Sequence, residues 1–147
     1  MNPNLKPSDQ VALLAVMDPV AQAAATVTST WVSLANCDAI LAIVQTGVMG
    51  AAATIDAKLR QATSAAGAGA KDIVGKAITQ LVKATNDNDQ AEINCRSDEL
   101  DVAGGFAYVQ LSITVGTAAS LIAAQILGFY GRYQPVANVS SVQQVVA

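Results

Sequence analysis

Histidine is absent from this 147-residue sequence, and its absence excludes several kinds of chemistry. Without imidazole there is no Ser-His or Cys-His catalytic pair and no histidine metal site. The glycine-rich stretch 67–71 (GAGAK) lacks the spacing and the following Ser or Thr of a phosphate-binding loop. We therefore predict a protein that is not an enzyme and that uses no cofactor and no metal.

Two acidic clusters were weighed against this prediction. The stretch 86–89 (NDND) offers oxygen ligands for calcium, but it lacks the glycine and the closing glutamate of an EF-hand loop, so we expect a turn. Asp98, Glu99 and Asp101 could act as paired carboxylates. Because Ser97 precedes them, a capped helical turn is the simpler interpretation.

Charge is scarce as well. Charged residues make up 13% of the chain, about half of the usual share, whereas hydrophobic residues make up 52%. A net charge of −3 gives no basic surface, which argues against direct binding of nucleic acid. No apolar run is long enough to span a bilayer. So little charge suits a surface covered by neighbouring subunits, and we predict a homo-oligomer.

Cysteine is limited to Cys37 and Cys95, too few for a disulfide framework. We predict two unlinked thiols, with Cys95 on the inward side of a strand and Cys37 in a turn, Asn36-Cys37-Asp38. The polar start of the chain does not resemble a signal peptide.

The clearest structural signal lies in Gly104–Gly116 (GGFAYVQLSITVG). Val109, Leu111, Ile113 and Val115 alternate with polar residues, which predicts a strand with one face in a core. We expect the other face, with Gln110 and Ser112, to meet solvent. The 29 alanines favour helix by propensity, but they cluster with Thr, Val and Gly and the apolar positions recur every two residues.

These patterns predict an all-β fold, an antiparallel β-sandwich of jelly-roll or Greek-key type, at 11–131. Extended arms are expected at Met1–Gln10 and at Arg132–Ala147. Strands are also expected at Val11–Met17 (stopped by Asp18-Pro19), Thr26–Leu34, Ala39–Thr46 (covered on both sides), Thr54–Ala62, Ile78–Val82, Ala91–Arg96 and Leu121–Phe129.

The end of the chain holds the candidate interface residues. Aromatic residues and arginine are enriched at interfaces, and the C-terminal arm carries valines but no charge after Arg132. We predict that this arm crosses to a neighbouring subunit. The candidates are Phe129, Tyr130, Arg132, Tyr133, Val136, Val139, Val142 and Val145. The alternative for Phe129–Tyr133 is a platform that stacks on carbohydrate.

The run Trp31–Thr63 (WVSLANCDAILAIVQTGVMGAAATIDAKLRQAT) resembles small virion proteins of tailed bacteriophages. The later segments FAYVQLSITVGTAAS and LGFYGRY are similar to the closing half of the same proteins. The resemblance implies a capsid decoration or cement protein on a shell of the HK97-type fold, with the major capsid protein and itself as partners. It also implies a place in the virion, assembled in the host cytoplasm.

Two other functions stay open at this point. In the first, the chain is again a phage protein, but it forms part of a ring in the tail or in the head–tail connector. The other is a carbohydrate-binding β-sandwich module that uses the aromatic cluster Phe129–Tyr133. All three functions are non-enzymatic.

Overall fold

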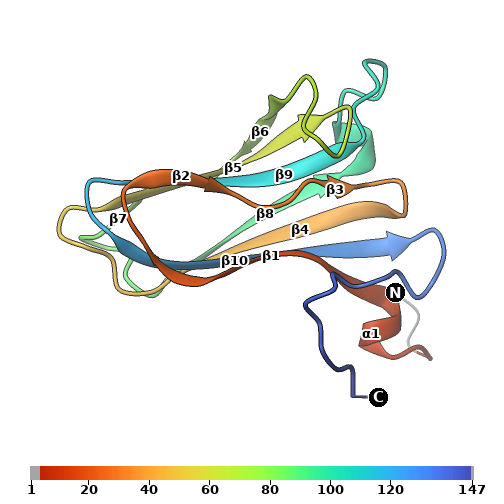
Figure 1. The fold of residues 1–147 in the computed structure, drawn as a ribbon, viewed down its shortest axis with the longest axis horizontal. Coiled ribbons are helices and arrows are strands. Elements are labelled where there is room, and N and C mark those ends of the chain that lie inside the picture. The colour runs from red at the N-terminus through yellow and green to blue at the C-terminus, as the bar shows by residue number, and fades with distance from the viewer. Residues whose placement is uncertain (1–3, 147) are drawn as a thin grey trace.

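The computed structural model describes residues 4–146, which fold into two antiparallel sheets packed face to face (Figure 1). The first sheet has the order β1-β10-β4-β8, and the second has the order β2-β9-β5-β6, with β3 paired to β9 and β7 to β5. The strands are β1 (Val11–Gln22), β2 (Ala25–Thr28), β3 (Val32–Ser33), β4 (Cys37–Thr46), β5 (Thr54–Ala62), β6 (Lys71–Ala77), β7 (Leu81–Val82), β8 (Gln90–Arg96), β9 (Tyr108–Gly116) and β10 (Ser120–Gly131).

This strand order is that of a jelly roll. If β2 with β3 and β6 with β7 are each taken as one interrupted strand, the chain has eight strands in two four-stranded sheets. The first strand lies beside the last in one sheet, and the second strand lies beside the seventh, β9, in the other. This is the arrangement of two interlocked Greek keys. The predicted all-β sandwich of jelly-roll type is therefore confirmed.

The core lies between the two sheets and follows the predicted alternation. Ile55, Ala57 and Leu59 of β5 face inward and are buried, as are Leu111 and Ile113 of β9. The first sheet contributes a second layer of side chains, Ile40, Ala42, Val44, Ile93, Cys95, Ile122, Ala124 and Ile126. Alanines alternate with larger residues, which lets the two sheets approach closely.

The outward face of β9 is buried, which corrects the expectation that it meets solvent. Gln110 is 7% and Ser112 is 4% exposed. The segment between β2 and β3 leaves the sheet here, and its first residue, Ser29, bonds to β9 at Leu111 through its backbone N–H (2.9 Å) and its hydroxyl (3.0 Å). The Gln110 side chain donates to the Ser29 carbonyl at 2.8 Å. Gln110 is thus bonded to the segment that follows β2, and local alternation in the sequence does not reveal such a contact.

Four predicted boundaries were wrong, and one of them is Ile78–Val82, of which only Leu81–Val82 is a strand. Val11–Met17 does not end at Asp18-Pro19, because a register shift between Met17 and Val20 lets β1 continue to Gln22. Thr26–Leu34 is interrupted between β2 and β3. Cys37 is not in a turn but begins β4 and is buried.

Both ends of the chain lie at one end of the sandwich (Figure 1). Within the predicted N-terminal arm, Pro7–Gln10 forms a short helix, α1, and residues 1–3 lie outside the described residues. The predicted one-turn helix after β8 is a 3₁₀ turn at Ser97–Glu99. The described part of the C-terminal arm, 132–146, has neither helix nor strand.

We expect Leu111→Ala to lower the free energy of unfolding by about 3 kcal/mol, because it leaves a cavity between the sheets at a side chain that is 0% exposed. Chemical denaturation measures the change. Val74→Ala is the matched control: this side chain is 97% exposed on β6, so its truncation should change stability by less than about 0.5 kcal/mol. Equal effects would contradict the described core.

Candidate assembly surface

The outer face of the first sheet carries rows of apolar side chains. Strand register places Leu13 opposite Leu127 and Leu127 opposite Leu41, so one row crosses three strands. All three are half-buried rather than covered. We call the apolar face the outward set Val11, Leu13, Val16, Leu41, Ile43, Leu127 and Phe129.

The apolar face changes the interpretation of β4. The sequence predicts a central strand covered on both sides, and β4 is central, between β10 and β8. Its inward residues are buried, but Leu41 and Ile43 on its outward side are half-exposed, with no second layer over them in the described chain. In the sequence, the sign of this surface was that the strand has apolar residues on both of its faces. A group of partly exposed apolar side chains on one face of a sheet is a candidate interaction site.

The C-terminal arm returns to its own sheet beside this face. The Leu13 N–H donates to Asn138 Oδ1 at 2.8 Å, and the Val139 N–H donates to the Leu13 carbonyl at 2.7 Å. The Val136 side chain lies so close to Gly131 that a Cβ there would be 2.3 Å from it. The arm is therefore bound to the edge of β1 in its own chain, whereas the sequence led us to predict that it crosses to a neighbouring subunit.

The predicted interface residues divide into two groups. Phe129 belongs to the apolar face, and Val136, Val139 and Val142 are half-buried along the arm. Tyr130 is 60%, Tyr133 is 81% and Val145 is 51% exposed. Arg132 pairs with Asp38 at 3.1 Å. The structure thus places Val139 at the β1 edge and Val136 beside Gly131 at the end of β10, and it leaves the second group at the surface.

The aromatic cluster is a poor stacking platform. The Phe129 and Tyr130 rings have centroids 6.5 Å apart, but their planes are inclined by 50°. Phe129 is also half-buried against the sheet. A sugar ring stacks on an exposed, flat surface, so this geometry favours packing over carbohydrate recognition.

A shallow hollow of about 590 Å³ lies at the end of β4 and β8. Asp38, Asn94, Arg96 and Tyr130 line it, and Arg96 pairs with Asp98 at 3.0 Å. Asp38 of its wall pairs with Arg132 at 3.1 Å. The contribution of β8 to this surface was not predicted, because no candidate residue was placed on this strand.

The outer face of the second sheet is polar, in contrast to the apolar face. Lys58 and Arg60 of β5 reach Asp72 of β6 at 2.7 and 3.6 Å, and Asp56 accepts from Gln80 at 2.7 Å. Lys58 and Arg60 thus form ion pairs with the neighbouring strand β6.

The candidate calcium loop is occupied by internal bonds. Asp87 accepts from the Met49 N–H at 2.9 Å and from Lys83, and Asn86 donates to Asp89 at 2.9 Å. The hydrogen bond from Lys83 and then that from Met49 lower the pKa of Asp87. Among the residues that the structure describes, no group of three possible ligands is close enough to hold a metal ion.

The three other carboxylates are bound in ion pairs. Lys76 pairs with Glu99 at 2.7 Å and Lys71 with Asp101 at 2.6 Å. The lysine hydrogen bonds, followed by backbone N–H donors, lower the pKa of both carboxylates. Asp98, bonded to Arg96, also has a lowered pKa. All remain charged near neutral pH, which suits structural pairs rather than a proton donor.

Both cysteines are buried and unlinked, as predicted. Burial raises the pKa of the Cys37 thiol, and it raises that of Cys95 to about 11. Such thiols stay protonated and unreactive at neutral pH.

No protein-family model and no curated protein sequence matches this chain. Among solved structures, the chain is similar to a chain in the cryo-EM structure of broad bean stain virus, with 9% identity and a TM-score of 0.47, over 93% of this chain and 94% of that one. It is also similar to a chain of the cowpea mosaic virus top component, the naturally occurring empty particles, with 10% identity and a TM-score of 0.42, over 90% and 91% of the two chains. Similarities of this size identify no functional residue. None of the described helices is long and apolar enough to cross a membrane.

We expect Asn138→Ala to release the arm from β1, because it removes the acceptor of the Leu13 N–H. Hydrogen exchange at Leu13 and Val139 should become faster, while global stability should fall by about 1 kcal/mol at most. Gln143→Ala, also in the arm but bonded only to nearby Ser141, is the control. Unchanged protection of Leu13 in Asn138→Ala would contradict this attachment.

We expect thermal stability to be nearly constant between about pH 5.5 and 8, because the chain has no histidine to titrate there. The lowered pKa values of Asp87, Glu99 and Asp101 stabilise the fold above their ordinary values of 3.8 to 4.5. This contribution is lost as the pH falls through the lower folded values. Melting followed by circular dichroism tests this, and a step between pH 6 and 8 would contradict it.

Proposed function

We propose that this chain is a non-enzymatic structural protein of a virus particle. The observation that carries the proposal is the apolar face on the outside of a jelly roll, a fold common among viral shell proteins. One outer surface is apolar and the other is covered with ion pairs. A protein that lies on a larger assembly needs this asymmetry, with one side bound and one side in water.

The finer proposal is a decoration protein on the shell of a tailed bacteriophage. It draws support from the resemblance of Trp31–Thr63 to small virion proteins of these phages. The apolar face with the half-buried arm residues Val136, Val139 and Val142 would meet the major capsid protein. The role would be mechanical, because contacts that bridge neighbouring subunits add buried area, and a standard interface buries on the order of 1,600 Å².

The alternatives predict different positions in the particle. A tail or connector component would form a ring at one vertex, whereas a decoration protein would cover the shell. A carbohydrate-binding module would need no particle. The inclined Phe129 and Tyr130 rings speak against this last alternative.

The test is imaging of the particles that contain this protein. Virus particles are purified from lysates of infected cells that express the chain. Cryo-EM of these particles should show the chain over the whole shell. Density at one vertex would favour the ring, and complete absence from purified particles would overturn the proposal. Binding to a glycan array that is lost in Tyr130→Ala would favour the carbohydrate module instead.

We expect Leu127→Lys, in the centre of the apolar face, to reduce the number of copies per particle at least about tenfold without unfolding the domain. Leu127 is half-exposed, so a lysine there can reach water in the free chain. Val74→Lys makes an equivalent change on the second sheet, where the side chain is 97% exposed, and should leave incorporation unchanged. Quantitative mass spectrometry of purified particles provides the measurement. Equal incorporation of both variants would mean that the apolar face is not the contact.

A further inference from the structure

Strand β8 is the regular open edge of this sandwich. The opposite edge of the same sheet, β1, contains register shifts and is bound by the arm at Leu13. In the second sheet, one edge is divided into β2 and β3, and the other is broken between β6 and β7, with Gly75 at φ +75°. In contrast, β8 pairs with β4 without interruption from Gln90 to Arg96, and in the described chain no strand lies on its other side.

The backbone of β8 shows which residues face the open side. The Thr46 N–H donates to the Asp89 carbonyl at 2.9 Å, and this pair fixes the phase of the antiparallel ladder. In such a ladder, alternate residues bond to the neighbour and those between them turn their N–H and C=O groups away. The Arg96 N–H agrees with this alternation, because it points away from β4 and donates to the Glu99 carboxylate at 2.8 Å. The groups at the open side are therefore those of Gln90, Glu92 and Asn94, with the Arg96 carbonyl.

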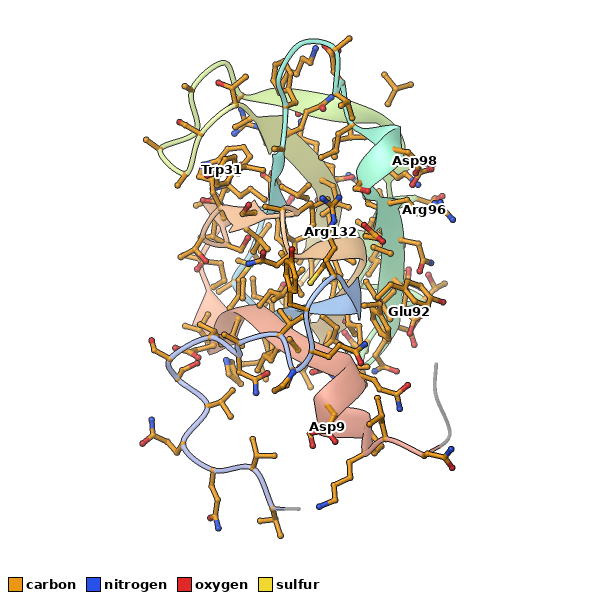
Figure 2. The ribbon with its side chains drawn as sticks, turned by 90° about the vertical axis from the view of Figure 1, so that its right-hand side faces the viewer. Asp9, Trp31, Glu92, Arg96, Asp98 and Arg132 are labelled. Atoms are coloured by element: carbon orange, nitrogen blue, oxygen red, sulfur yellow. The ribbon has the colours of Figure 1, made fainter. Side chains whose placement is uncertain are left out.

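The side chains of the same residues are self-complementary. Glu92 and Arg96 lie two residues on either side of Asn94, and Figure 2 shows both pointing away from the body of the molecule. In an antiparallel pair with Asn94 opposite Asn94, each Glu92 lies opposite the Arg96 of the other copy. A two-fold axis at Glu92 or at Cys95 would instead place Glu92 opposite a carboxylate, that of Glu92 or Asp98. An axis at Ile93 would form no charge pair.

We propose that two copies of this chain join through β8, antiparallel and about a two-fold axis at Asn94, into one eight-stranded sheet. Main-chain hydrogen bonds between the two Asn94 residues, and from each Glu92 N–H to the Arg96 carbonyl of the other copy, form the interface. Glu99 already binds the Arg96 N–H, so the paired segment ends at Arg96.

This arrangement joins the two apolar faces. The row Leu13, Leu127 and Leu41 continues in register to Asn94. Across the two-fold axis the row passes into Asn94, Leu41, Leu127 and Leu13 of the second copy, on the same side of the sheet. The dimer thus presents one surface of twice the area, able to contact two neighbouring subunits of a shell. The inference deepens the proposed function, because it names a second copy of the chain as a partner, and it rests on that function.

The sharpest test is a disulfide at the two-fold axis. Directly opposed residues of a hydrogen-bonded pair have Cα atoms about 5.5 Å apart, which is within the range that a disulfide spans. Asn94→Cys in the full chain should therefore form a covalent dimer under mild oxidation. In the matched control, Gln90→Cys, the same axis separates the two new cysteines by eight residues, or about 27 Å, and should give no dimer. Cys37 and Cys95 are buried and stay out of the reaction.

Charge exchange gives a second measurement that needs no cysteine. Glu92→Arg should weaken the dimer about tenfold in analytical ultracentrifugation, because it places like charges opposite each other twice. Adding Arg96→Glu should restore it. Asp18→Arg, the same charge change on β1, is the control and should have no effect.

Crosslinking of both cysteine variants would overturn the inference. So would the absence of crosslinking in both variants while the chain is still dimeric. Either result would leave the proposed function standing. A chain that is monomeric at about 100 μM, five orders above a typical nanomolar complex, would overturn the inference too. The proposed function is tested separately, by the presence of the chain in purified particles.

Discussion

The packing of two inner sheet faces against each other is the interaction on which the rest of this structure depends. Ile55, Leu59, Leu111 and Ile113 are fully buried between the sheets, and no disulfide or metal supports them in the described chain. Their burial fixes the phase of each strand, because a slip by one residue would turn every side chain to the wrong face. Once the inner face is fixed, the composition of each outer face is fixed as well.

The two outer faces then have opposite characters. On the second sheet, Asp56, Lys58 and Arg60 bond to residues of β6 and of the segment after it, and Ser29 covers part of β9. On the first sheet, leucines form a row that crosses three strands and ends at Asn94 of β8, and Gln125 and Gln45 are polar residues on the same face. One side of the molecule is therefore suited to water and the other to a protein surface. A low overall charge is a consequence of this division rather than of a larger core.

Much of the candidate surface was not predictable from the sequence. The valines of the arm and the aromatic residues near Phe129 were recognised as interface candidates by their type. Leu13 and Leu127 were not, because nothing local reveals that they lie in one row across three strands. The attachment of Asn138 to Leu13 joins residues 125 positions apart, and no spacing rule reaches that far.

The sequence by itself determined the class of the fold and the face of most strands. Period-two alternation at Thr54–Ala62 and Val109–Val115 is local, and burial of one side of a strand follows from it. The tertiary structure decided what each outward face contacts, such as Gln110 bonded to the Ser29 carbonyl, and which edge stays open. The physical reason is that a strand's own residues choose its inner side, whereas its outer side and its edge depend on segments distant in the chain.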